Sequence, residues 1–294
     1  MPTSLAPYKG RLAVIALALL GAISLGVVAV WAPKAGEARS TLPPANEAPA
    51  PQAATAGLAA NLSDAMRAGR TIEIGVFGDS YGDGIWWALT QQLRGDARFR
   101  LHQFSQRSTG FAGWADMTGD FRARLDSQPI DAAIISFGVN DTHEVNVGGH
   151  RAAFLSDEWR EVVGARLASV VGLLRERGVQ VYWIGMPRMR RPEFETKIRA
   201  LNGFYAQRMQ ALAVPFIDTV SATTDREGRF ADHLVNPDTG QPMLARAGDG
   251  VHMSMNGYRL LTQGLARHLV RRATAAQAEA SRQAAAQGPA PNAG

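Results

Sequence analysis

Short apolar runs alternate with amphipathic segments through the middle of the chain. Large apolar residues recur at helical spacing over residues 85–93, 163–174, 198–209 and 258–269. Before and between these segments lie apolar runs with the length and composition of buried strands, at residues 72–77, 99–104, 132–137, 179–186 and 214–217. Alternation of this kind is typical of a parallel sheet with helices on both faces. We therefore predict an α/β domain built on a five-stranded, mainly parallel sheet.

The two ends of the chain differ in character from the middle. Residues 12–31 are uncharged and predominantly apolar, which is about the length needed to cross the core of a bilayer. We expect a transmembrane anchor or uncleaved signal there, after a cytoplasmic N-terminus at 1–11, and a cleaved signal peptide is the alternative. Proline and alanine dominate residues 32–60, which predicts an extended linker. Residues 273–294 have few bulky side chains and predict a low-complexity tail, helical at most near its start and then disordered, which leaves 61–272 as the folded domain.

The charges that flank the predicted span give a slight orientation bias. Lys9 and Arg11 precede it, whereas Lys34 and Arg39 follow it. The expected arrangement is a single pass through the cytoplasmic membrane, with the folded domain on the periplasmic or extracytoplasmic side. The membrane is then a partner of the N-terminal helix.

Composition narrows the classes of chemistry and of partner. The 294 residues include no cysteine, which excludes disulfides, thiolate metal sites and a cysteine nucleophile. The net charge of +5 comes from scattered arginines, and no recognisable nucleic-acid-binding module surrounds them. We therefore expect no nucleic-acid partner, and the sequence points to no particular protein partner.

Polar motifs follow three of the predicted strands and precede the last helix. GDS at 78–80 comes after the first strand, Gly110 lies in the loop after the second, and GVND at 138–141 follows the third. DGVH at 249–252 stands just before the last helix. Open parallel sheets bind ligands beyond the carboxyl ends of their strands, so these four segments are expected to meet at one edge.

Residues of these four segments supply the groups that acyl transfer needs. A serine hydroxyl becomes nucleophilic when an imidazole takes its proton, and a carboxylate orients that imidazole. Ser80, His252 and Asp249 supply these three groups. The developing oxyanion needs fixed donors, which the backbone N–H groups of Ser80 and Gly110 and the side-chain amide of Asn140 can provide.

Each of these residues also has an ordinary structural interpretation. Ser80 could cap the following helix, and Asn140 could be a turn residue after a strand. Asp249 and His252 could be a cap and a surface histidine before the last helix. One motif alone therefore says little about chemistry, and the prediction depends on all four motifs in their order.

The four motifs in this order resemble those of the SGNH (GDSL-type) hydrolase family, over about residues 70–272. The resemblance implies a three-layer α/β/α flavodoxin-like fold and a chemistry that uses no metal and no cofactor. It implies a nucleophile at Ser80 and a base pair formed by Asp249 and His252. It further implies an oxyanion hole formed by Ser80, Gly110 and Asn140.

Finer features resemble a bacterial cell-envelope branch of that family, of unknown function and often tethered by an N-terminal span. They are STGFAGW at 108–114, GVND at 138–141 and the segment 240–261. Met253 stands where an aromatic residue often follows the histidine, and residues 113–117 vary the usual loop. Neither departure touches a catalytic role, but both affect the predicted substrate pocket.

Five further residues near the motifs are candidates for substrate binding. Trp114 and His143 could line an acyl or sugar pocket, although large aromatic side chains are often buried for packing alone. Arg188, Arg190 and Arg191 follow the fourth strand at the predicted active edge. Their guanidinium groups could contact an anionic glycan, and a solvated loop is the alternative.

The sequence therefore predicts a membrane-tethered serine esterase that removes an acetyl or other small acyl group from a carbohydrate of the cell envelope. An O-acyltransferase would use the same acyl-enzyme, with a sugar hydroxyl in place of water. A non-catalytic glycan-binding module is the alternative from another class. Its expected mark is the loss of the nucleophile, the base or an oxyanion donor, and the sequence retains all of them.

Overall fold

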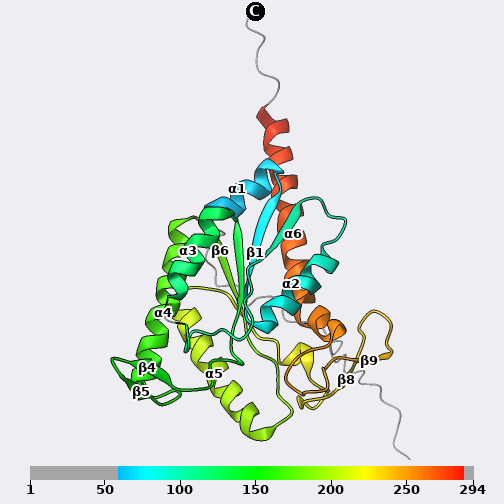
Figure 1. Cartoon of the computed structure of the whole chain (residues 1–294). Helices are drawn as coiled ribbons and strands as arrows, with labels where there is room; N and C mark the ends of the chain where they lie inside the picture. Colours follow the sequence, from blue (N-terminus) through cyan, green and yellow to red (C-terminus); the bar gives the residue numbers. More distant parts are fainter. Residues whose placement is uncertain (1–58, 115, 288–294) are drawn as a thin grey trace, which may run out of the picture. The chain divides into compact units, whose positions relative to one another are not determined.

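Five parallel strands form the central sheet of the computed structural model, which describes residues 59–114 and 116–287 (Figure 1). The strands lie in the order β2-β1-β3-β6-β7, and every pairing is parallel. Their bounds are β1 Ile72–Gly78, β2 Phe99–Gln103, β3 Ala132–Ser136, β6 Gln180–Ile184 and β7 Phe216–Ile217. Each strand coincides with a run in which the sequence predicts one, so the predicted five-stranded sheet is confirmed.

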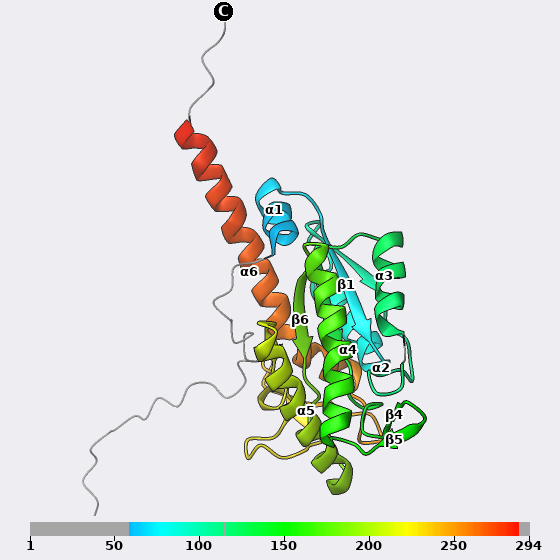
Figure 2. The same cartoon turned by 90° about the vertical axis from the view of Figure 1, so that its left-hand side faces the viewer.

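Helices cover both faces of the sheet and complete three layers (Figures 1 and 2). One face packs against α1 Ala60–Ala68, α2 Ser80–Gln92 and α6 Met255–Gln287. The other face packs against α3 Met117–Ser127, α4 Asp157–Glu176 and α5 Pro192–Ala211. Because both faces are covered, β1 and β3 are buried almost throughout instead of alternating between core and solvent. The predicted α/β/α arrangement is confirmed.

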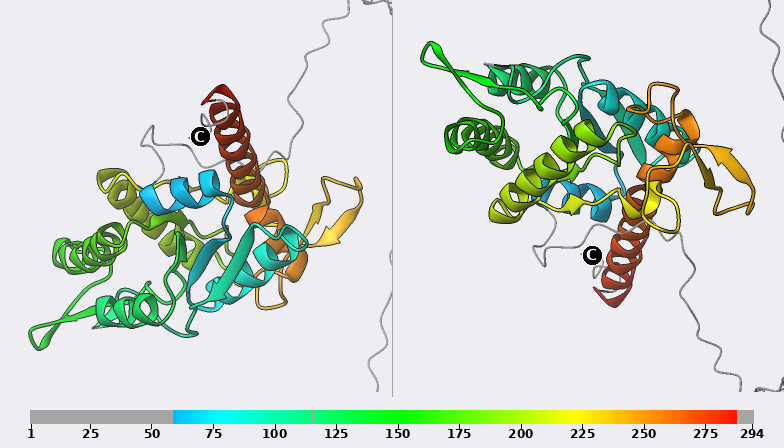
Figure 3. Two further views of the ribbon diagram at one scale, coloured as in Figure 1. Left: turned by 90° about the horizontal axis from the view of Figure 1, so that it is seen from above. Right: turned by 90° about the horizontal axis from the view of Figure 1, so that it is seen from below.

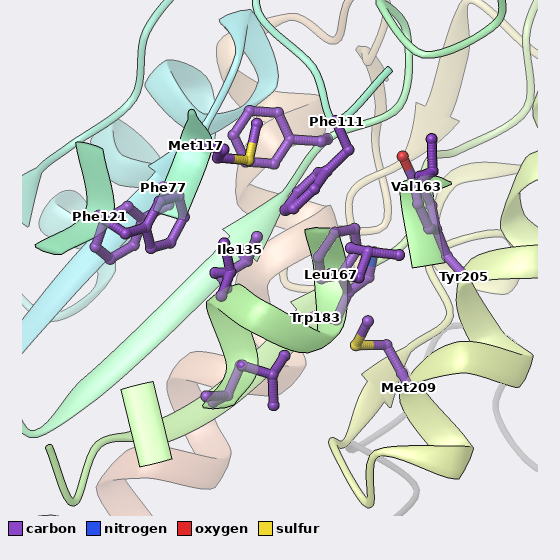
Figure 4. Close-up of a cluster of buried hydrophobic side chains, with 14 of the residues drawn as sticks. Phe77, Phe111, Met117, Phe121, Ile135, Val163, Leu167, Trp183, Tyr205 and Met209 are labelled. Carbon is purple, nitrogen blue, oxygen red and sulfur yellow. The ribbon is translucent and has the colours of Figure 1, made fainter. Parts of the chain in front are cut away.

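Successive side chains of a strand enter the two cores in turn. Ile74 of β1 packs in the core of α1, α2 and α6, whereas Phe77 packs in the core of α3, α4 and α5. Figure 4 shows this second core, in which the rings of Phe77 and Phe121 stack with centroids 4.1 Å and planes 12° apart. In the same core the rings of Trp183 and Tyr205 lie 4.8 Å apart. These aromatic contacts join α3 and α5 to the sheet.

The sequence does not predict α1, α3 or two short hairpins. The hairpins are β4 Val145–Val147 with β5 His150–Ala152, and β8 His233–Val235 with β9 Pro242–Leu244. A 3-10 turn, η1 Ser221–Thr223, lies between β7 and β8 in the chain. Both hairpins lie at the end of the sheet where β1 leads into α2, and the view from below shows them on opposite sides (Figures 1 and 3). They flank the edge at which the four motifs are expected to meet.

The last helix is longer than the sequence predicts. Residues 273–287, expected as part of a tail that is helical at most near its start, belong to α6, and residues 288–294 lie outside the described residues. Alanine and glutamine make up most of this segment, and both are good helix formers, so a shortage of bulky side chains does not prevent a helix. Ala273 is buried in the core that α6 shares with α1, so the helix stays packed past the expected domain end at residue 272.

The predicted N-terminus at 1–11, the predicted span at 12–31 and nearly all of the linker at 32–60 lie outside the described residues. Within 59–114 and 116–287, no helix has both the length and the hydropathy needed to cross a membrane. The membrane anchor and the location of the domain stay predictions from the sequence.

The strand order creates a crevice where the motifs lie. From β1 the chain moves outward to β2 and then crosses back over β1 to β3, so the winding direction reverses between β1 and β3. Doubly wound sheets bind ligands at this switch point, beyond the carboxyl ends of the strands. Ser80 follows β1 and Asn140 follows β3, so the fold brings both residues to the switch point.

The substitution Phe121→Ala should lower the free energy of unfolding by about 3–5 kcal/mol, because it leaves a cavity beside Phe77 in a closed core. Urea unfolding of the purified protein measures this change. Arg122→Ala, at an exposed position of the same helix, should change it by less than about 0.5 kcal/mol. A loss below about 1 kcal/mol for Phe121→Ala would show that the stacked rings contribute little to holding α3 on the sheet.

Candidate active site

Ser80 is the first residue of α2 and stands directly beyond β1. Asp79 caps this helix, since its carboxylate accepts a hydrogen bond of 2.8 Å from the backbone N–H of Tyr81. The hydroxyl of Ser80 is therefore not used as the cap. Its backbone N–H is one of the first-turn groups that a helix leaves unpaired at the positive end of its dipole. The tight turn requires Gly78, because a Cβ there would overlap the carbonyl oxygen of Ser136.

A chain of hydrogen bonds connects Ser80 to His252 and Asp249. Ser80 Oγ lies 2.7 Å from Nε2 of His252, and Nδ1 of that imidazole lies 2.6 Å from Oδ2 of Asp249. Oδ1 of Asp249 accepts from the backbone N–H groups of Val251 and His252, at 2.8 and 2.9 Å. Gly250 makes the turn between them with a φ of 69°. The structure thus brings the three predicted groups together.

Asp249 is ionised at neutral pH. Partial burial acts to raise its pKa, but hydrogen bonds from the His252 side chain and from two backbone N–H groups outweigh burial and lower the pKa to about 2. The carboxylate keeps the ring proton of His252 on Nδ1. Nε2 is then the nitrogen that can accept the proton of Ser80.

Tyr81 supports this arrangement, and the sequence analysis did not identify it. Its hydroxyl donates to the carbonyl oxygen of Val251, and its ring stacks on the imidazole of His252 with centroids 5.8 Å and planes 25° apart. Tyr81 is fully buried, and the ring of Tyr258 meets it edge-on at 5.6 Å. Its position after the GDS motif was the only signal, and a tyrosine there is equally typical of ordinary core packing. Tyr81 contacts both the backbone and the ring of the histidine loop.

Asn140 and Gly110 enter the site from the loops after β3 and β2. Nδ2 of Asn140 donates to Oδ2 of Asp79 at 3.0 Å, which orients the amide and leaves its second N–H for a ligand. Gly110 packs against the carboxylate of Asp141 so closely that a Cβ would overlap Oδ1. Gly110 and Asn140, two of the three predicted oxyanion donors, line one cavity.

Asp141 holds the loop that contains Gly110. Its carboxylate oxygens accept hydrogen bonds from the backbone N–H of Ala112 and the hydroxyl of Tyr205, each at 2.7 Å. Arg166 of α4 donates to the carbonyl oxygen of Ala112 at 3.0 Å. Because Tyr205 belongs to α5, two helices on one face of the sheet determine where the Gly110 loop lies.

Burial controls the ionisation of the two aspartates next to the site. Both Asp79 and Asp141 have an exposed fraction of 0%. Desolvation raises the pKa of Asp79 to about 6, although hydrogen bonds from the backbone and from Asn140 oppose it. Desolvation likewise raises the pKa of Asp141 to about 7, against hydrogen bonds from Ala112 and Tyr205. These two carboxyl groups take up protons near neutral pH.

Two cavities meet beside Ser80. The small cavity, of about 520 Å³, is lined by Gly110 and Asn140, two of the three predicted oxyanion residues, and also by Trp114 and His143. The large cavity, of about 780 Å³, contains Ser80 and His252. The two cavities share Ser108, Val139 and Asn140 in their walls. In the part of the chain that the structure describes, no group of three or more histidine, aspartate and glutamate side chains is arranged to hold a metal ion.

The three predicted arginines occupy different environments. Arg188 pairs with Glu195 at 2.8 Å, and Arg190 pairs with Asp232 at 2.5 Å. Neither of these arginines lines the small or the large cavity, whereas Arg191 lines the large one. The sequence alone does not separate them, because Asp232 reaches Arg190 only through the fold. Of the three arginines, Arg191 is the one placed to meet a ligand.

Stability should fall as the pH rises from about 5 to 8, because Asp79 and Asp141 bind protons more tightly in the folded chain than in the unfolded one. Their stabilising contribution is complete below the unfolded pKa of about 4, and it is lost as the pH rises through folded pKa values of about 6 and about 7. Asp141→Asn keeps the shape of the side chain but does not ionise. Between about pH 5 and 8 the free energy of unfolding of this variant should therefore fall by on the order of 2 kcal/mol less than that of the wild type.

Urea unfolding across that pH range measures the difference between the two slopes. Asp126→Asn, which changes an aspartate with a half-exposed side chain on α3, should leave the wild-type slope unchanged. Parallel curves for the wild type and Asp141→Asn would contradict a raised pKa at Asp141.

Several solved bacterial structures are similar to this chain in fold. A putative acylhydrolase from Bacteroides fragilis NCTC 9343 is 16% identical, with 68% of this chain and 88% of that chain covered and a TM-score of 0.47. A GDSL-like lipase from Bacteroides thetaiotaomicron VPI-5482 has the same identity, coverage and TM-score. A catalytic mutant of an acetylxylan esterase from Geobacillus stearothermophilus is 15% identical, with coverages of 67% and 94% and a TM-score of 0.47. At such identities a likeness concerns the fold alone.

The sequence itself has one informative match. No curated protein matches it. Residues 73–268, however, match a protein family, and this range includes every segment that meets at Ser80. Because the match covers more than half of the chain, the protein belongs to the family described as "Protein of unknown function (DUF459)".

Proposed function

We propose that this protein is a serine esterase that cleaves an acetyl or other small acyl ester through an acyl-enzyme. The observation that carries the proposal is the line of hydrogen bonds from Ser80 Oγ to His252 Nε2, at 2.7 Å, and from His252 Nδ1 to Asp249, at 2.6 Å. A serine hydroxyl, an imidazole and an ionised carboxylate in this order form the arrangement that activates serine for attack on a carbonyl.

The first half of the reaction forms the acyl-enzyme. His252 takes the proton of Ser80 as Oγ attacks the ester carbonyl carbon, and the anionic Asp249 stabilises the imidazolium. The carbonyl oxygen becomes an oxyanion that accepts hydrogen bonds from the backbone N–H groups of Ser80 and Gly110 and from Nδ2 of Asn140. The intermediate then collapses, the bond to the alcohol oxygen breaks, and His252 gives its proton to the departing alcohol.

The second half releases the acyl group as a carboxylic acid. Water gives a proton to His252 and attacks the acyl carbon, and the same donors stabilise the second oxyanion. Ser80 recovers its proton when the bond between Oγ and the acyl carbon breaks. If a sugar hydroxyl takes the place of water, the same residues transfer the acyl group instead.

We further propose an acylated carbohydrate of the cell envelope as the substrate. The half-buried rings of Trp86 and Trp87 line the large cavity. They support a sugar as the alcohol part of the ester, since aromatic faces pack against the apolar side of a sugar ring. The expected location outside the cytoplasmic membrane depends on the predicted span at 12–31, and therefore on the sequence alone.

Ser80→Ala should lower the turnover of p-nitrophenyl acetate by roughly 10⁴-fold or more, because it removes the nucleophile. It should also abolish covalent labelling by a serine-directed fluorophosphonate. Release of p-nitrophenol and gel detection of the label measure the two effects. Ser127→Ala, at an exposed serine at the end of α3, is the control and should match the wild type in both. Ester cleavage and labelling that survive in Ser80→Ala would rule out Ser80 as the nucleophile.

Tyr81→Phe should lower kcat by roughly tenfold with KM nearly unchanged. The carbonyl oxygen of Val251, next to His252, loses the hydrogen bond from the Tyr81 hydroxyl, while the contact between the ring and the imidazole stays. Steady-state kinetics well below the unfolding temperature measure this effect. Tyr182→Phe, at a buried tyrosine of β6 that lines neither cavity, should keep the wild-type kcat. An unchanged kcat in Tyr81→Phe would show that the stacked ring alone positions His252.

A further inference from the structure

The two sides of the site differ in which reacting group they contain. The large cavity contains both Ser80 and His252, whereas the small cavity contains Gly110 and lacks both of them. Asn140 lines both cavities and marks the boundary between them. The site therefore has one side that contains the imidazole of His252 and one side that contains the oxyanion donor at Gly110.

The chemistry of ester cleavage decides which part of the substrate lies on each side. The alcohol oxygen must come within hydrogen-bond reach of Nε2 of His252, because this nitrogen supplies the proton with which the alcohol departs. The acyl group points away from the imidazole while its oxygen faces the donors at Gly110 and Asn140. The alcohol part of the substrate thus occupies the large cavity, and the acyl part occupies the small one.

The charges of the large cavity are unevenly paired. Asp83 and Arg107 form an ion pair at 2.6 Å, and Gln103 also donates to Asp83 at 2.9 Å. Arg191 lines the same cavity and has no ion pair within residues 59–114 and 116–287. Its guanidinium lies 5.6 Å from the ring of Phe194. The wall of the large cavity therefore contains one guanidinium, that of Arg191, with which no acidic side chain of the described residues pairs.

We propose that Arg191 binds an anionic group, either a carboxylate or a phosphate, on the alcohol part of the ester. The preferred substrate is then an ester of an acidic carbohydrate, and this inference rests on the proposed esterase function. A guanidinium suits the task, because its planar array of donors matches the oxygens of both anions. Arg191 is the N-cap residue of α5, and Glu193 in the first turn of that helix does not line the cavity, so it leaves Arg191 free to meet the ligand.

Aromatic side chains complete the proposed alcohol site. Trp86 and Trp87 of α2 and Phe194 of α5 line the large cavity together with Arg191. Apolar walls with few convergent polar groups are typical of small-molecule sites, in which the polar groups determine the orientation of the ligand. Here the rings would hold the sugar ring, and Arg191 would select the sugars that carry a negative charge.

The experiment compares matched sugar acetates in the full-length enzyme. Methyl glucuronoside, methyl glucoside and methyl glucoside 6-phosphate are each mono-O-acetylated at random, so that the ester stands at several distances from the charged group. Acetate release gives kcat/KM for the wild type, Arg191→Gln and Arg191→Lys. Arg199→Gln, at an exposed arginine of the same helix outside both cavities, is the matched control for the loss of a positive charge.

The wild type should favour at least one acidic ester over the neutral ester, and the preferred one identifies the anion as a carboxylate or a phosphate. Arg191→Gln should lower kcat/KM for that ester roughly tenfold or more and leave the neutral ester unchanged. Arg191→Lys should recover part of the loss, and Arg199→Gln should behave as the wild type.

Three outcomes would overturn the assignment of Arg191. They are equal losses on acidic and neutral esters in Arg191→Gln, no preference for an acidic ester in the wild type, and no cleavage of any sugar acetate. In each case Ser80-dependent cleavage of p-nitrophenyl acetate would leave the esterase function standing. Absence of that cleavage would instead remove the proposed function itself.

Discussion

The buried carboxylate of Asp79 joins the parts of the site that come from different strands. One of its oxygens accepts from the N–H of Tyr81 and so begins the helix that presents Ser80, while the other accepts from the amide of Asn140 beyond β3. Ser80 and Asn140, the proposed nucleophile and one proposed oxyanion donor, are thus attached to the same buried group. Gly82 lets α2 approach the segment after β2 closely, since a Cβ at that position would lie only 2.9 Å from the side chain of Ser105.

Burying Asp79 and Asp141 destabilises the charged form of each, and their raised pKa values express this cost. Both oxygens of each group nevertheless accept a hydrogen bond, and the donors lie on separate segments. A satisfied buried network of this kind specifies one arrangement of the loops, whereas a partly satisfied one would destabilise the fold. The two aspartates therefore make the loops after β1, β2 and β3 rigid relative to one another.

The fold was largely predictable from the sequence, because most strands of the sheet are apolar runs, the edge strand β2 alternates apolar and polar residues, and each main helix has an apolar stripe. Those residues of the site that belong to the four motifs were predictable, since a parallel sheet brings the segments after its strands to one edge. What the sequence did not reveal depends on contacts made through the fold. The hydroxyl of Tyr81 donates to the backbone carbonyl oxygen of Val251, which lies far away in the sequence. The β4–β5 hairpin did leave a local signal, the Gly148-Gly149 pair, which is typical of a tight hairpin turn.

The arginines show why net charge is a poor guide to partners in this protein. A charge of +5 suggests an anionic ligand for any exposed arginine, yet several arginines serve the fold instead. Arg190 donates through Nη1 to the carbonyl oxygen of Gly248 at 2.7 Å and through its backbone N–H to that of Gly250 at 3.0 Å. Its pairing with Asp232 then ties the loop of Asp249 to the segment that leads into β8.

Arg246 is buried behind the same loop, where Nη2 donates to the carbonyl oxygen of Arg188 at 2.6 Å and the guanidinium lies 4.8 Å from the ring of Phe230. Arg188 and Arg190 have already used their charge on Glu195 and Asp232, and Arg246 is buried inside the fold. An arginine indicates an anionic ligand when it lines a cavity and no acidic side chain of the fold pairs with it. Among the arginines next to this site, that condition separates Arg191 from Arg188 and Arg190.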